Sequence, residues 1–242
     1  MAINKEELKR RILFEDNHII VVNKMPSEIV QGDKTGDQPL VEALKEYVGE
    51  KYNKPGNVFL GVVHRIDRPT SGLVIFARTT KALTRLNELL KTREVSKKYW
   101  AVVKNVPSEP TGRLEHYLRK NEKQNKSYVV DAKTPGAKKA ELVYQVLKHA
   151  QNYALLEVEL LTGRHHQIRA QMAAIGCPIK GDLKYGFDRS NPDGSIHLHA
   201  RQLSFVHPVK KENINIVAPV PEDTLWQFFE KEVSDKQPST KK

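Results

Sequence analysis

The chain has 242 residues, which is enough for one large domain or two small ones with a substantial core. Its 40 Lys and Arg against 29 Asp and Glu give a formal charge of +11. That charge favours a polyanionic partner, nucleic acid first and an anionic membrane surface second, with a solvated basic surface as the alternative. The one cysteine, Cys177, excludes an intramolecular disulfide and suits a reducing compartment.

The sequence shows no membrane-targeting feature. No apolar run approaches the roughly 18 residues of a membrane span. The opening segment, residues 1–11, is charged and lacks the apolar stretch of a secretory signal. We therefore predict a cytoplasmic protein that does not associate with membranes, and we expect a monomer.

In chain order, the first half alternates short apolar runs with polar turns. Asp16-Asn17 is a turn pair between two such runs. Five residues at helical spacing, from Leu40 to Val48, would share one helix face. The predicted elements are strands at 12–14 and 18–22, a loop at 26–39, a helix at about 40–48, a strand at 59–63 and a helix at 79–92.

The second half is richer in strands. Residues 119–139 carry seven Lys or Arg against two acids, which predicts an exposed excursion with a hairpin around 127–130. Pro221 could open a last helix whose apolar side includes Phe228. The other predicted elements are strands at 99–103, 141–147, 154–161, 196–206 and 214–218, and a helix at 165–175 that ends at Gly176.

Numerous short strands with helices between them favour an α+β fold. We predict a mixed, largely antiparallel central sheet with flanking helices and loop insertions. The predicted organisation is an N-terminal segment at 1–11, a single catalytic domain at 12–233 and a basic disordered tail at 234–242.

The most informative motif is residues 64–73, His-Arg-Ile-Asp-Arg-Pro-Thr-Ser-Gly-Leu. Asp67 lies between Arg65 and Arg68, and neighbouring cations favour an ionised carboxylate that could act as a nucleophile or base. Pro69 pushes Arg68 towards extended backbone, which places Asp67 on a loop that leads into the strand from Leu73. A structural Asp–Arg pair in a turn is the alternative.

A second basic motif follows the strand at 154–161. The turn Thr162-Gly163 precedes a predicted helix whose first residues are Arg164, His165 and His166. Helix N-termini bind anions, so this segment suits a phosphate or carboxylate. Arg169 could pair with Asp67 in a bidentate contact. A solvated basic helix face is the alternative.

The sequence gives weaker evidence for other kinds of site. The histidine pairs 165/166 and 197/199 could be metal ligands, but no H-E-x-x-H or Cys/His cluster accompanies them, and we predict no metal. Neither a phosphate-binding loop nor a dinucleotide fingerprint is present, so we predict no nucleotide cofactor. Tyr99 follows two lysines and could stack on a base; packing within a sheet is equally compatible with this segment.

Residues 64–73 closely resemble the H-R-L-D-x-x-T-S-G-L signature of the RluA-type pseudouridine synthases, with Ile66 in place of Leu. Five further motifs occur in the family's order and carry the resemblance from about residue 13 to 221. They lie at residues 19–24, 98–103, 163–169, 178–186 and 199–208.

The resemblance implies an enzyme that isomerises uridine to pseudouridine in ribosomal or transfer RNA, on a flipped-out base and without a cofactor. Asp67 matches the essential aspartate, which either attacks C1′ or starts an elimination-type route. Tyr99 matches the tyrosine that packs on the base and is a candidate for proton transfer at C5. Arg169 matches the arginine that pairs with the aspartate, and Ile168 matches an apolar residue beneath the base.

Further substrate contacts are implied. Arg65 matches a residue that helps to hold the rearranged RNA. We also place His64, Arg164 and Gln167 among the substrate-binding residues. A non-catalytic RNA-binding or ribosome-assembly protein that retains the fold is the alternative function.

The chain departs from the family pattern in two places. After Lys24 the family usually continues Pro-small-Gly, whereas this chain reads Met25-Pro26-Ser27-Glu28, so the local turn is not carried over. Gln171 replaces a frequent His, which we interpret as structural. Because only about a dozen residues precede the first strand, we expect the N-terminal RNA-binding domain of many relatives to be absent. Substrate selection would then fall on the catalytic domain, together with residues 119–139.

Overall fold

The computed structural model describes residues 2–234. Within them the chain forms two compact units. The first contains residues up to Lys97 together with Ala200–Pro219, and the second contains Lys98–His199 together with the residues from Val220. The single domain expected at 12–233 stays a prediction. Apart from Ser234, the predicted tail lies outside the described residues.

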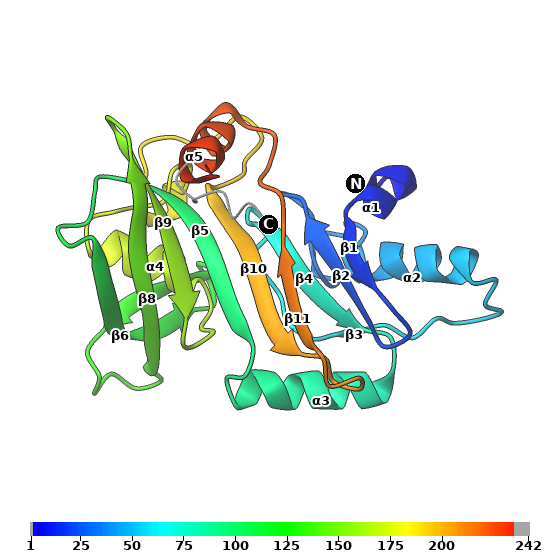
Figure 1. Ribbon diagram of the computed structural model, residues 1–242. Helices are drawn as coiled ribbons and strands as arrows, with labels where there is room; N and C mark the ends of the chain where they lie inside the picture. Colours follow the sequence, from blue (N-terminus) through cyan, green and yellow to red (C-terminus); the bar gives the residue numbers. More distant parts are fainter. Residues whose placement is uncertain (1, 235–242) are drawn as a thin grey trace. The chain divides into compact units, whose positions relative to one another are not determined.

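The first unit is a sheet with helices on both faces (Figure 1). Its two central strands are buried along their whole length, which explains why both read as continuous apolar runs. The strand order is β1 (Ile12–Glu15), β2 (Ile19–Lys24), β4 (Ser71–Ala77), β10 (Leu198–Val206, from Ala200 on in this unit) and β11 (Asn213–Val217), with the short β3 (Gly61–Val62) paired to β4.

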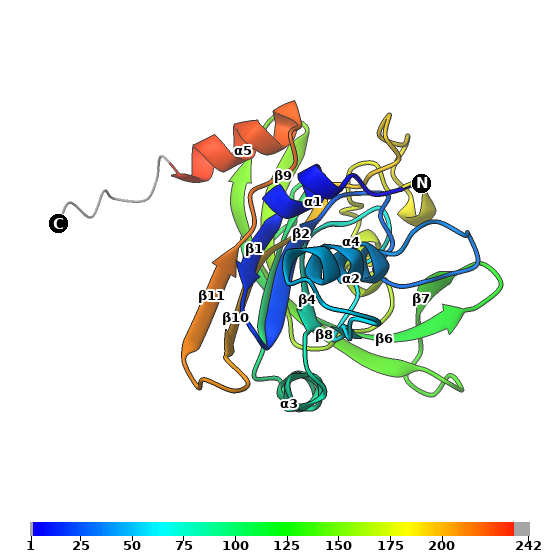
Figure 2. The same ribbon diagram turned by 90° about the vertical axis from the view of Figure 1, so that its right-hand side faces the viewer.

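Side-chain alternation divides the core of this unit between the two faces. Ile20 and Val22 of β2 pack with α2 (Leu40–Lys51), and α1 (Lys5–Arg10) lies beside α2 (Figure 2). Ile19 and Val21 point to the other face, which α3 (Thr80–Lys91) covers. The predicted helix at 79–92 is thus confirmed with its leucines inward.

The second unit is a twisted antiparallel sheet (Figure 1). Trp226 and Phe229 of α5 (Thr224–Ser234) pack on Trp100 and Val102 of the sheet. The strand order is β5 (Ser96–Lys104, from Lys98 on in this unit), β9 (Tyr153–Leu160), β8 (Lys138–His149), β6 (Thr111–Asn121) and β7 (Lys126–Val130). The unit also contains α4 (Gln167–Ala174) and the 3-10 turn η1 (Leu183–Tyr185).

The α+β prediction with a largely antiparallel sheet is confirmed, and the hairpin expected around 127–130 is β6–β7. Some of the predicted boundaries are wrong. The strand expected at 59–63 is only Gly61–Val62. The helix expected from His165 begins at Gln167, because His166 adopts the left-handed conformation (φ 53°) and its ring lies 3.0 Å from the Tyr185 hydroxyl. Arg164 and His165 therefore lie before the helix and not in its first turn.

The last helix also differs from the prediction. It begins at Thr224, after Asp223, whose carboxylate accepts the backbone N–H groups of Leu225 and Trp226 as an N-cap. Phe228 is 43% exposed and does not belong to the buried side. None of the helices in the described part of the chain has the length and apolar character needed to cross a bilayer.

A substitution at Gly72 tests the close packing of β4 against β10 in the first unit. Its φ is +111°, and an added Cβ would lie 2.4 Å from the Ala200 carbonyl oxygen and 2.5 Å from the Ala200 nitrogen. We expect Gly72→Ala to lower the free energy of unfolding by about 3 kcal/mol or more, because β10 must move. Gly136→Ala, with φ +79° and open space around it, should cost about 1 kcal/mol. Equal losses in denaturant titrations would contradict this packing.

Candidate active site

Asp67 lies on the loop between β3 and β4, at the entrance to the buried strand. Its carbonyl oxygen accepts the N–H of Thr70 at 3.0 Å, which closes a turn over Arg68 and Pro69. Thr70 is buried, Asp67 is half-buried and Arg65 is exposed. The sequence prediction of an acid on a loop that feeds a strand is therefore confirmed.

His64 fixes the start of this loop. Its Nε2 accepts the backbone N–H of Ile75 in β4 at 3.2 Å, so the proton of the neutral ring is on Nδ1. Burial, together with the nearby charge of Lys97, lowers the pKa of His64 to about 3. The neutral ring thus ties the loop to the middle of β4. Its predicted contact with substrate stays a prediction.

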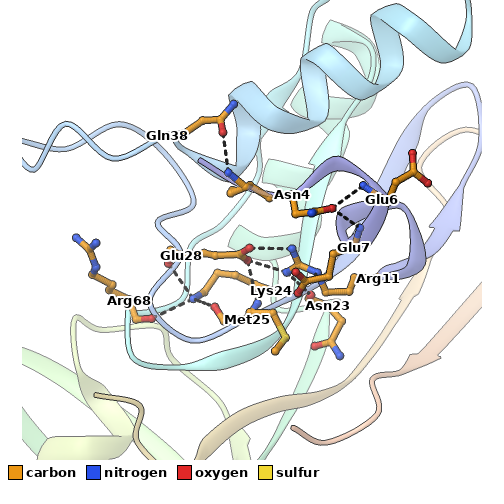
Figure 3. Close-up of polar contacts among 11 residues, drawn as sticks. Asn4, Glu6, Glu7, Arg11, Asn23, Lys24, Met25, Glu28, Gln38 and Arg68 are labelled. Carbon is orange, nitrogen blue, oxygen red and sulfur yellow. Dashed lines mark hydrogen bonds and ion pairs between the residues drawn. The ribbon is translucent and has the colours of Figure 1, made fainter. Parts of the chain in front are cut away.

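Lys24 fixes the other side of the loop. Its side chain has no exposed surface, and its ammonium group donates to the carbonyl oxygens of Met25 (2.8 Å), Glu28 (2.9 Å) and Arg68 (3.1 Å) (Figure 3). An ammonium group has three N–H donors, and each has a backbone acceptor here. The backbone next to Asp67 is therefore bonded to the end of β2 and to the loop that follows it.

Burial and the neighbouring charges act on the pKa of Lys24 in opposing directions. Burial lowers its pKa from 10.5 to about 7. The negative charges of Glu28 and Asp67 raise the pKa, whereas Arg11 and Arg68 lower it. The charge of Asp67 is therefore one of the influences that favour the ionised form of Lys24.

Arg68 is held by both its backbone and its side chain. Its carbonyl oxygen accepts the N–H of Ser27 at 2.9 Å in addition to the Lys24 bond. Its guanidinium forms an ion pair with Asp37 and a hydrogen bond with the Thr35 hydroxyl at 3.3 Å. This arginine therefore ties the loop to the segment between β2 and α2, a role that its place beside Asp67 in the sequence does not reveal.

Tyr99 belongs to the second unit, where it pairs with Val158 of β9. Because side chains alternate along a strand, Tyr99 points to the face of β5 opposite Trp100 and Val102. Its ring is buried, with 7% of its surface exposed.

Arg169 is buried in α4 and forms a bidentate ion pair with Asp182. Its Nε lies 2.7 Å from Oδ2 and its Nη2 lies 2.8 Å from Oδ1 of that carboxylate, and its guanidinium lies 5.1 Å from the centre of the Tyr185 ring. This bidentate contact is made with a carboxylate of the same unit and is not the predicted one. The pairing of Arg169 with Asp67, which belongs to the first unit, stays a prediction, and Ile168 is buried next to Arg169.

Gln167 and Arg164 organise the turn before α4. The Gln167 amide donates to the Glu141 carbonyl at 2.9 Å, and its oxygen accepts from the Thr162 hydroxyl and the Arg164 N–H. Arg164 is exposed, and its Nε donates to the Lys139 carbonyl at 2.9 Å. Gln167 therefore has a clear structural role, and its predicted contact with substrate stays a prediction.

The comparison with protein families agrees with these motifs. The family model described as RNA pseudouridylate synthase matches residues 18–174, which include Asp67, Tyr99 and Arg169. The chain belongs to the RNA pseudouridylate synthase family.

Relatives of this synthase family match most of the chain. A Bacillus subtilis (strain 168) protein named uncharacterized RNA pseudouridine synthase YlyB is 36% identical over 90% of this chain and 71% of its own length. The ribosomal large subunit pseudouridine synthase D of Yersinia pestis is 32% identical over 91% of this chain and 70% of its own. A solved structure, human RNA pseudouridylate synthase domain containing 4, matches with a TM-score of 0.77 and 26% identity over 95% of each chain.

Sequence reasoning missed three residues that hold the synthase's candidate site residues. Lys24, Asp182 and Tyr185 all lie in segments that carry the family resemblance, but the motifs alone indicate no role for them. The available signal was a lysine two positions after an apolar run, and an acid and a tyrosine that closely follow Pro178. All three side chains are at least 93% buried, as Asp182 and Tyr185 are 1% and 7% exposed and Lys24 has no exposed surface.

The histidine pairs have structural partners. His197 contacts Asn191 and Asp223 at 3.0 Å each and stacks on Trp226. Between residues 2 and 234, no three His, Cys, Asp or Glu side chains are grouped as a metal site would require.

The buried Lys24 predicts a pH-dependent stability. Because its pKa is about 7 in the folded chain and 10.5 for a fully solvated lysine, the unfolded chain binds more protons between these values, and stability rises with pH across that window. Relative to Lys24→Met, the wild-type free energy of unfolding should rise by on the order of 4 kcal/mol from pH 7 to 10.5. Denaturant titrations of both proteins measure it. A difference that does not change with pH would contradict a lowered pKa of Lys24 in the folded chain.

Proposed function

We propose that this enzyme converts specific uridines of ribosomal or transfer RNA to pseudouridine, with Asp67 as the reactive group. The observation that carries the proposal is the signature at residues 64–73, with Ile66 as its one departure, on a loop anchored at His64 and Arg68 in a member of the synthase family. Relatives named ribosomal large subunit pseudouridine synthase support ribosomal RNA as the first substrate to test. RNA of this kind would place the activity in the cytoplasm, and we propose that the enzyme acts as a monomer.

The reaction is an isomerisation that needs no cofactor. The bond from uracil N1 to ribose C1′ breaks, the base turns, and C5 forms a new bond to C1′. C5 then loses its proton and N1 gains one, so that atoms and charge balance. Asp67 either attacks C1′ or starts an elimination-type route, and both need its carboxylate ionised.

The other residues support this chemistry. We assign to Tyr99 a packing contact with the base and a part in the proton transfer from C5. We assign to Arg169 the pairing with Asp67, for which Asp182 and Tyr185 hold its guanidinium in one orientation. Ile168 would lie beneath the base, and the exposed Arg65 would hold the rearranged RNA. His64, Arg164 and Gln167 remain candidates for secondary contacts.

A basic hairpin supports RNA binding. Flipping a base out costs a few kcal/mol, which phosphate contacts must offset. Arg119, Lys120 and Lys123 are exposed on the β6–β7 hairpin. Lys126 is half-buried, with its ammonium 5.0 Å from the Tyr185 ring centre, so it also helps to hold the hairpin. We propose that the three exposed cations contact phosphates.

Mapping pseudouridine tests the activity. Unmodified cellular RNA incubated with the wild-type enzyme should gain pseudouridine at discrete sites, and the same maps identify the target. Asp67→Ala should lower the rate by at least about a thousandfold, because it removes the reactive group. Product formed by Asp67→Ala at the wild-type rate would refute the role of Asp67. No product on any RNA would favour a non-catalytic RNA-binding or ribosome-assembly protein.

Charge reversal tests the hairpin. Arg119→Glu with Lys123→Glu should weaken RNA binding and reduce the slope of log affinity against log salt by about 1 to 2, since two phosphate contacts are lost. Lys54→Glu with Lys81→Glu makes the same charge change at exposed positions in the first unit and is the matched control. Equal effects of the two double variants on binding and on the salt slope would rule out a specific hairpin contact.

A further inference from the structure

A buried ion pair closes the turn that follows Lys24. Both Nη groups of Arg11 lie 2.8 Å from the Glu28 carboxylate, which also accepts the N–H of Met25 at 3.0 Å (Figure 3). The side chains of Arg11 and Glu28 are only 10% and 14% exposed. The carboxylate thus has three donors and binds the two ends of the turn, Met25 and Glu28, to the residue that follows α1.

This Met25–Glu28 turn contacts the backbone next to Asp67. Ser27 donates its N–H to the Arg68 carbonyl at 2.9 Å, and it does so from the left-handed conformation with φ 70°. That conformation costs a non-glycine residue free energy and persists only where its surroundings hold it. Because the Glu28 carboxylate bonds Met25 across Ser27, it holds Ser27 in the conformation that reaches Arg68.

Glu28 also favours the charged form of Lys24. Burial has the largest effect on the pKa of Lys24 and lowers it, and the charge of Glu28 is the largest influence that raises it. Asp67 also raises this pKa, whereas Arg11 and Arg68 lower it. Without the Glu28 charge, Lys24 would face two arginines with Asp67 alone in opposition. It would then lose its proton more easily, and a neutral amine has only two N–H groups for three carbonyls.

The turn is a feature of this chain. The resembling family usually continues Pro-small-Gly after the lysine, whereas this chain has Met25-Pro26-Ser27-Glu28. The departure replaces a glycine turn with one that a side-chain carboxylate closes, and Arg11 supplies the matching cation.

We infer that Arg11 and Glu28 are positioning residues for the reaction of Asp67. They act through the Met25–Glu28 turn and through the charge of Lys24, which together hold the backbone at Arg68. This inference rests on the proposed function, because it concerns the rate of that reaction.

Single-turnover rates at saturating RNA, measured from pH 6 to pH 9 beside RNA affinity, test the inference. Glu28→Gln should lower the rate at least about tenfold at pH 8 and less at pH 6, where Lys24 regains its proton. RNA affinity should change by less than about twofold, because neither residue is placed on the RNA. Arg11→Met added to Glu28→Gln should cause no further loss, since both act through one ion pair.

Two variants complete the experiment. Glu42→Gln breaks an exposed ion pair with Lys45 and should behave as wild type. Glu28→Asp keeps the charge with a shorter side chain, so its rate should fall while its pH profile stays that of the wild type. If Glu28→Gln does not fold, the rate and the pH profile of Glu28→Asp test the inference in its place.

The outcomes separate the two proposals. An inactive wild-type enzyme would overturn the proposed function and the inference with it. With an active wild type, the inference alone is overturned by an unchanged rate in Glu28→Gln, by a loss that is equal at every pH, or by an unchanged rate in Glu28→Asp.

Discussion

The buried ammonium group of Lys24 is the constraint on which the Asp67 loop depends. A charge without access to water is costly unless hydrogen bonds satisfy it, and here backbone carbonyls of Met25, Glu28 and Arg68 do so. Movement of any of these segments would leave a buried cation short of an acceptor. The backbone beside Asp67 is therefore held in one place, as a reaction that needs a fixed carboxylate requires.

The second unit uses a buried cation in a similar way. Arg169 is fixed by the Asp182 carboxylate and by the Tyr185 ring. The Tyr185 hydroxyl in turn accepts the Ser127 N–H at 2.8 Å and lies 3.0 Å from His166 Nδ1, so it connects the basic β6–β7 hairpin to the residue before α4. The same tyrosine thus supports an arginine assigned to the chemistry and a hairpin assigned to RNA binding.

The sequence predicted the strands and helices whose buried faces show in the spacing of apolar residues. β2, β4, α2 and α3 follow from apolar spacing, because each has a buried face that the spacing reports. It could not predict the left-handed His166, which depends on Tyr185, 19 positions later. Nor could it show that Arg169 binds Asp182, or that Lys24 turns back to three carbonyls, because side-chain partners depend on tertiary packing.

The central claim is that the Asp67 carboxylate carries out the isomerisation. Forming the bond from C5 to C1′ releases the hydrogen of C5, so RNA with tritium at uridine C5 reports the reaction directly. In a single turnover, wild-type enzyme should release tritium as pseudouridine forms, whereas Asp67→Asn, which keeps the shape and removes the charge, should bind the RNA and release none. Tritium release by Asp67→Asn at the wild-type rate would contradict the account.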